Sequence, residues 1–171
     1  SLFGPNGYGS IYSIKLQDLS FAVLHGFSNT DGARPLAELR LSANDGKLYG
    51  TTSAGGTNSG STTEVSGLGT FFSIDRTGSN FTKLHNFAAK DGTGPASRVV
   101  EQAAGVFMGL ASSAGNCGYG TLWRYSAAGD TVTGNTKCGQ KKSDQNGGGG
   151  HAGLVLLALL GGLGLYRRRV A

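Results

Sequence analysis

The chain has 171 residues, of which 31 are glycine and three are proline, and its formal net charge is +5. Residues 1–129 hold nine Lys or Arg against eight Asp or Glu, whereas residues 130–171 hold six against two. Because the basic excess is confined to the C-terminal end, the remainder carries no basic stripe of the kind that binds nucleic acid. The many glycines predict a turn-rich chain without long helices outside the C-terminal segment.

The chain repeats itself at a spacing of 60 residues. Residues 9–14 (Gly-Ser-Ile-Tyr-Ser-Ile) return at 69–74 as Gly-Thr-Phe-Phe-Ser-Ile, and residues 24–27 (Leu-His-Gly-Phe) return at 84–87 as Leu-His-Asn-Phe. A third copy begins at Gly120, after only 51 residues. Such a period is the mark of a repeat architecture. We therefore divide the chain into a partial repeat 1–8, repeats 9–68 and 69–119, and a partial repeat 120–128.

Each full repeat contains four short β-type runs, which in the first repeat are Ser10–Leu16, Phe21–Phe27, Leu36–Leu41 and Lys47–Ser53. Residues 44–46 (Asn-Asp-Gly) supply the positive φ that a tight hairpin turn between the last two runs needs. Four short strands joined by Gly-rich turns predict an all-β fold of propeller-like blades, about two complete and others partial. Separate hairpins or a β-solenoid are the alternatives.

A run from Leu48 to Gly56 (Leu-Tyr-Gly-Thr-Thr-Ser-Ala-Gly-Gly), then Gly-Thr-Phe-Phe and Leu-His-x-Phe, resembles the GloVer tandem repeat. The resemblance covers about residues 1–128. It weakens in the second copy, where residues 107–112 read Phe-Met-Gly-Leu-Ala-Ser. It implies a propeller-like repeat domain outside the cell, often followed by an interchangeable surface anchor, and it implies no established activity.

His25 and His85 are the obvious catalytic candidates, but both recur at the same repeat position. A residue present in every repeat serves the repeat, since an active site needs one constellation only. We expect each ring to tie its strand to a neighbouring turn by an N–H bond. Asp31 and Asp91 lie in Asp-Gly turns, where the carboxylate can cap its own backbone.

Calcium binding by the oxygens of Ser28–Asp31 is an alternative, although no stretch has the spacing of a known calcium loop. No nucleophile elbow, metalloprotease helix or phosphate-binding loop is present in the sequence. The sequence thus predicts no catalytic residues, no metal and no cofactor.

Cys117 and Cys138 are the only cysteines. In an exported protein an even number favours a disulfide, here closing a loop worth about 3 kcal/mol by the chain-entropy model. Two free thiols are the alternative.

The C-terminal end has a layout of its own. A Gly-rich linker, 129–150, ends in Gly147, Gly148, Gly149 and Gly150, and the segment 151–171 holds 15 uncharged residues followed by Arg167, Arg168 and Arg169. As a helix the uncharged stretch would measure roughly 22 Å, against a hydrocarbon core of about 30 Å. The three arginines favour a cytoplasmic C-terminus.

This order resembles the GlyGly-CTERM sorting signal of Gram-negative surface proteins. The resemblance implies a transient inner-membrane anchor that a rhomboid-type protease cuts near the glycines. An ordinary C-terminal tail anchor is the alternative.

Residues 1–10 lack the features of a signal peptide, so we expect the chain to be the C-terminal piece of a longer exported protein. The predicted function is a non-enzymatic binding or interaction module at the bacterial surface or secreted. Its expected partners are the inner membrane and the sorting protease, with no nucleic acid, and the residues identify no surface ligand. The alternatives are a structural stalk, or the C-terminal part of an extracellular propeller lyase or glycosidase whose catalytic residues lie in preceding sequence.

Overall fold

The computed structural model describes residues 4–57, 67–116, 118–129 and 131–133. They belong to the first of the two units into which the chain divides, Ser1–Cys138. Their regular structure consists of strands and one 3-10 turn, η1 (Ala89–Asp91), which confirms the all-β class for this part of the chain. None of its helices is long and apolar enough to cross a membrane. The predictions for both cysteines, for the C-terminal segment and for nearly all of the linker lie outside the described residues.

All four predicted runs of the first repeat form strands, namely β1 (Ser10–Ile14), β2 (Phe21–Gly26), β3 (Arg40–Leu41) and β4 (Leu48–Thr52). The predicted hairpin turn lies between β3 and β4, and Gly46 in it has φ +74°. The third run is shorter than expected, because only two of its residues pair with β4.

The second repeat forms β5 (Thr70–Ile74), β6 (Thr82–Asn86), β7 (Thr93–Pro95), β8 (Val100–Ala103) and β9 (Val106–Ser113). The third copy gives β10 (Thr121–Ser126) and β11 (Thr131–Thr133).

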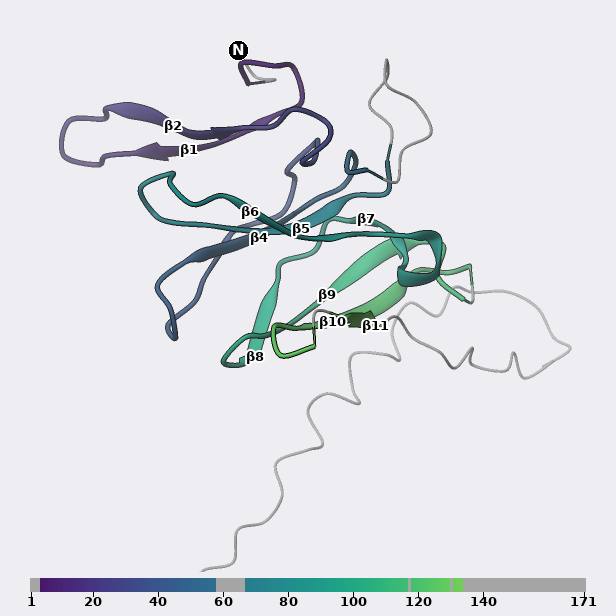
Figure 1. The fold of residues 1–171 in the computed structure, drawn as a ribbon. Helices are drawn as coiled ribbons and strands as arrows, with labels where there is room; N and C mark the ends of the chain where they lie inside the picture. The colour runs from purple at the N-terminus through teal and green to yellow at the C-terminus, as the bar shows by residue number, and fades with distance from the viewer. Residues whose placement is uncertain (1–3, 58–66, 117, 130, 134–171) are drawn as a thin grey trace, which may run out of the picture. The chain divides into compact units, whose positions relative to one another are not determined.

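The sheets are out of phase with the sequence repeats. The first sheet is β1–β2, the second has the order β3-β4-β5-β6, and the third joins β7 and β8 to β9, followed by β10 and β11 (Figure 1). Strand β4 ends one repeat and pairs antiparallel with β5, which opens the next, from Leu48–Ile74 to Thr52–Thr70. Strands β9 and β10 cross the next boundary in the same way. The second and third sheets therefore each draw on two repeats, whereas the sequence favours one blade per repeat. Both sheets are open, and the propeller-like arrangement of the repeats stays a prediction.

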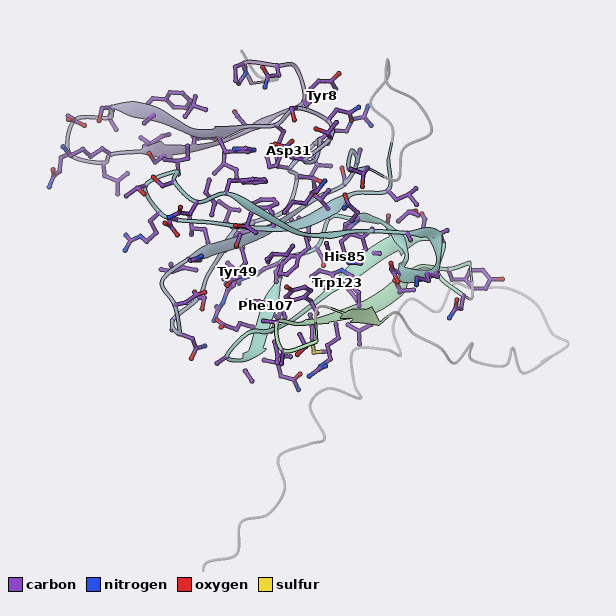
Figure 2. The ribbon with its side chains drawn as sticks, viewed as in Figure 1. Tyr8, Asp31, Tyr49, His85, Phe107 and Trp123 are labelled. Carbon is purple, nitrogen blue, oxygen red and sulfur yellow. The ribbon has the colours of Figure 1, made fainter. Side chains whose placement is uncertain are left out.

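The second sheet is a middle layer that packs on both sides. Phe71 and Phe72, consecutive on β5, enter two different cores. The core shared with the first sheet contains Ile11, Phe27, Phe72 and Ile74. The core shared with the third sheet contains Tyr49, Phe71, Phe87, Val99, Phe107, Ala111, Trp123 and Tyr125. Figure 2 shows Tyr49, Phe107 and Trp123 gathered in this second core.

Burial along the strands follows from this layering. All five residues of β5 are buried, whereas buried and exposed residues alternate along β10 and only Ile11 is buried on β1. An outer sheet with one covered face shows the two-residue period of its side chains, and a sheet covered on both faces does not.

One strand aromatic does not pack in a core of the described residues. Tyr49, Phe71, Phe72, Trp123 and Tyr125 are buried, but Tyr12 is 55% exposed. Its side chain lies on the face of β1–β2 opposite the core residue Ile11, where no other sheet of the described residues packs.

Candidate functional site

The most distinctive polar contact joins His25, on β2, to Asp31 in the turn that follows. The ring Nε2 lies 3.0 Å from Asp31 Oδ2, and the backbone N–H of Ser28 donates to Oδ1 at 2.8 Å. Because an ionised carboxylate only accepts hydrogen bonds, Nε2 carries the proton. The Asp31 carboxylate thus holds the end of β2 and the turn after it together.

The second repeat builds the same contact. His85 Nε2 lies 3.2 Å from Asp91 Oδ2, and the backbone N–H of Ala88 donates to the same oxygen at 3.2 Å. This carboxylate sits in η1 and is 4% exposed, against 24% for Asp31. The predicted tie between histidine and turn is confirmed in both copies (Figure 2 labels Asp31 and His85).

A threonine from the following repeat completes each contact. The Thr70 hydroxyl donates to the backbone carbonyl of Asp31 at 3.0 Å, and the Thr121 hydroxyl donates to that of Asp91 at 2.5 Å. Both threonines open the first strand of the next copy. Sequence reasoning missed them, although Gly-Thr recurs at 69–70 and 120–121, where a new copy of the repeat begins.

The glycine after each aspartate leaves room for that threonine. Gly32 and Gly92 have φ of +143° and +93°, a region that side chains rarely adopt. A Cβ on Gly32 would lie 2.8 Å from the Thr70 hydroxyl oxygen, and one on Gly92 would collide with the hydroxyl of Thr121. The Asp-Gly pair therefore combines a hydrogen-bonding side chain with a close approach of two chain segments.

Aromatic rings surround the first polar contact and reach into the next sheet. The His25 ring stacks on Phe81 with centroids 3.8 Å apart and planes 4° apart. Phe27, two residues along the chain, meets Phe72 edge-on at 5.4 Å. The His25 ring thus packs against an aromatic ring that follows β5. These ring contacts join the first sheet to the second.

A second polar cluster also connects two sheets. The hydroxyl of Ser42 and the amide of Asn44 both donate to Glu101 Oε1, at 2.9 and 2.8 Å. Glu101 lies on β8, so the β3–β4 hairpin is tied to the third sheet.

Tyr49 and Asp45 form a short hydrogen bond beside this cluster. The Tyr49 hydroxyl donates to Asp45 Oδ2 at 2.6 Å. Burial, and then this bond, raises the pKa of Tyr49 well above its usual range. Burial alone would raise the pKa of Asp45, but the hydrogen bonds from Tyr49, Lys47 and Ser42 outweigh it, and the net pKa is lowered.

Neither cluster offers a metal cage. Both carboxylate oxygens of Asp31 already accept hydrogen bonds, from Ser28 and from His25. In the part of the chain that the structure describes, no three His, Cys, Asp or Glu side chains lie close enough to hold a metal ion. The chemistry that this geometry supports is the fixing of turns and of neighbouring sheets.

A family model, the Gloeobacter/Verrucomicrobia repeat, matches residues 2–161. The chain belongs to this family. The match confirms the resemblance to the GloVer repeat and extends beyond residue 128, where the sequence resemblance ends. No curated protein is detectably similar to the chain.

Proposed function

We propose that this GloVer protein is an exported repeat module, displayed at the cell surface or secreted, that binds a partner without catalysing a reaction. The observation that carries the proposal is the duplication of the polar site: His25 and His85 have the same kind of partner, at 3.0 and 3.2 Å. Groups repeated in this way serve the scaffold, because a catalytic site needs one asymmetric constellation.

We propose further that the C-terminal end is a sorting signal. Its support is the order in the sequence of four glycines, a short uncharged segment and three arginines, Arg167 to Arg169. An apolar segment weakened by Gly161, Gly162 and Gly164 is a marginal span that an intramembrane protease can unwind. The arginines hold the C-terminus in the cytoplasm, at about 2.5–3.5 kcal/mol for each one moved to the bilayer centre.

Mass spectrometry of the protein from its native host tests the sorting proposal. We expect the surface-exposed or released pool to end near Gly147–Gly150, whereas a variant with Ala at these four positions keeps its C-terminus. Replacing Gly139 by Ala, outside the four-glycine run, is the matched control and should leave processing unchanged. Recovery of a peptide ending at Ala171 from the exposed pool of the natural protein would contradict cleavage.

The non-catalytic role of the histidines has its own test. His85→Gln removes the ring that Asp91 accepts from, and loss of a hydrogen bond to a buried carboxylate costs about 1–3 kcal/mol. We expect the melting temperature of the full chain to fall by several degrees, since a domain of this size loses about 2–8 °C per kcal/mol. An unchanged melting temperature would show that His85 is not kept for stability and would reopen a catalytic role.

A further inference from the structure

Two buried polar atoms have no hydrogen-bond partner among the described residues of the second and third sheets. They are the hydroxyl oxygen of Thr51, on β4, and the indole Nε1 of Trp123, on β10. Thr51 is 1% exposed and Trp123 is 0% exposed. A polar group that loses its contacts with bulk water is costly to bury unless another partner replaces them, so native proteins almost always pair such groups. Both atoms therefore need a partner.

Strand pairing places Thr51 in the contact between the second and third sheets. We call this contact the second joint, and the contact between the first and second sheets the first joint. Thr51 is directly opposite Phe71 in the β4–β5 register, so the two side chains lie on one face of the sheet. Phe71 belongs to the core of the second joint, and its ring centroid lies 5.3 Å from that of Trp123. Thr51 is thus buried on the face of β4 that packs against the sheet of Trp123.

The indole N–H of Trp123 lies over the middle of β9. Trp123 is opposite Gly109 in the β9–β10 register, and a Cβ on Gly109 would lie 3.0 Å from Nε1. The indole therefore reaches across from its own strand to the neighbouring one, and its polar edge lies where Gly109 has no side chain.

Strands β4 and β9 run alongside each other in the second joint. At one end the Tyr49 and Phe107 rings stack with centroids 4.0 Å apart. At the other end β7 pairs with the last residues of β9, and a Cβ on Gly94 of β7 would lie 3.9 Å from the backbone oxygen of Ser53. Thr51 is midway between Tyr49 and Ser53. Its side chain therefore lies over the middle of β9, where the indole N–H also lies.

We propose that one internal water molecule bridges the Thr51 hydroxyl and the Trp123 indole N–H. The indole N–H only donates, so the water oxygen accepts from Nε1, whereas the hydroxyl can either donate to the water or accept from it. A buried water makes two to four hydrogen bonds, and these two atoms supply the minimum. Phe72 occupies the repeat position of Trp123 and has no polar side-chain atom, so the site belongs to the second joint and not to the first. The proposal concerns the scaffold and does not depend on export or on a surface ligand.

The single tryptophan of the chain makes this site directly observable. In the full chain labelled with 15N at tryptophan, one indole N–H signal belongs to Trp123. A rotating-frame Overhauser experiment gives a cross-peak between this proton and a water molecule held beside it. The sign of the cross-peak separates such a contact from chemical exchange with the solvent. We expect a contact cross-peak in the natural chain.

Three variants identify the second partner of the water. Thr51→Val keeps the shape of the side chain but removes the hydroxyl, and it should abolish the cross-peak and move the indole proton signal upfield. Thr51→Ser keeps the hydroxyl and should keep the cross-peak. Thr82→Val is the matched control, because Thr82 is exposed at the start of β6, and it should change neither signal. Circular dichroism and thermal unfolding check that all three variants retain the fold.

A double-mutant cycle measures the same link through stability. Trp123→Phe installs the residue that the second repeat has at this position, Phe72. We expect Thr51→Val to raise the unfolding equilibrium constant about tenfold in the natural chain, as measured by urea titration. In the Trp123→Phe background the same change should have less than about a threefold effect, because the bridge is already lost there.

The other outcomes overturn the proposal. The absence of a contact cross-peak in the natural chain, or a cross-peak that arises from exchange alone, shows that no water is held at the indole. A cross-peak that persists in Thr51→Val assigns the water to a different partner. Equal effects of Thr51→Val on stability in both backgrounds show that the two side chains do not share a bridging molecule.

Discussion

At the scale of single residues, Thr70 and Thr121 each form a hydrogen bond to the preceding repeat that their sequence positions did not predict. Each donates its hydroxyl to the carbonyl of an aspartate 39 or 30 residues earlier, and that aspartate holds a histidine with its carboxylate. Each aspartate thus accepts hydrogen bonds through both its side-chain carboxylate and its backbone carbonyl. One residue fixes the turn of its own repeat and the start of the next.

Thr121→Val tests this link in the second joint. The two side chains have nearly the same shape, but valine leaves the buried carbonyl of Asp91 without its donor. We expect a loss of about 1–2 kcal/mol in the free energy of unfolding, measured by urea titration. Thr121→Ser keeps the hydroxyl and should recover most of that loss. Equal stability of the valine variant and the natural protein would contradict the link.

Tyr49→Phe tests the hydrogen bond to Asp45 through its pH dependence. The folded-state pKa of Tyr49 is raised, so its contribution to stability is complete below about pH 10 and is lost as pH rises toward the folded pKa. The folded-state pKa of Asp45 is lowered, so its contribution is complete above the unfolded pKa and is lost as pH falls through the folded pKa.

We therefore expect Tyr49→Phe to be less stable than the natural protein by about 1 kcal/mol near pH 7. The difference should shrink both above about pH 10 and below about pH 4, the unfolded pKa values of the two groups. Urea midpoints across this range measure it. Tyr119→Phe is the control, because that ring is 85% exposed. A difference that is constant with pH would show that the hydroxyl makes no bond to a titrating partner.

At the scale of strands, the repeated motifs predict the local structure well and the assembly of strands less well. The Asn-Asp-Gly turn and the histidine tie follow from residues close in sequence, so local chemistry was enough to predict them. The threonine partners were not predicted, because their bonds join different repeats. A repeat period gives the length of the unit but not the place where one sheet ends and the next begins.

Tyr12 illustrates the same limit. Alternation along β1 places Ile11 and Tyr12 on opposite faces, but alternation cannot say how many neighbouring sheets cover a strand. Phe72 occupies the equivalent position and is fully buried, because a sheet packs on that face of β5. Burial in this protein therefore depends on the position of a repeat in the stack as well as on its sequence.

At the scale of the whole molecule, neighbouring repeats are joined by main-chain hydrogen bonds as well as by the covalent chain, because the sheets are out of phase with the sequence repeats. The register from Leu48–Ile74 to Thr52–Thr70 joins the last strand of one repeat to the first strand of the next. Separating two repeats therefore requires breaking a strand ladder in the middle of a sheet.

A protease site inserted between residues 58 and 66 tests this. After cleavage we expect the two fragments to stay together on size-exclusion chromatography, because β4 and β5 remain paired on opposite sides of the cut. They should separate only in denaturant. Separation in native buffer would show that covalent continuity holds the repeats together.

The phase difference also bears on how such a chain grows over generations. A duplication of one 60-residue repeat adds four strands, two that belong to one sheet and two that begin the next. The crossover point need not respect a structural border, since each copied segment carries the aspartate for the threonine after it. An added copy therefore keeps the strand pairing and the threonine-to-aspartate bond at each new boundary.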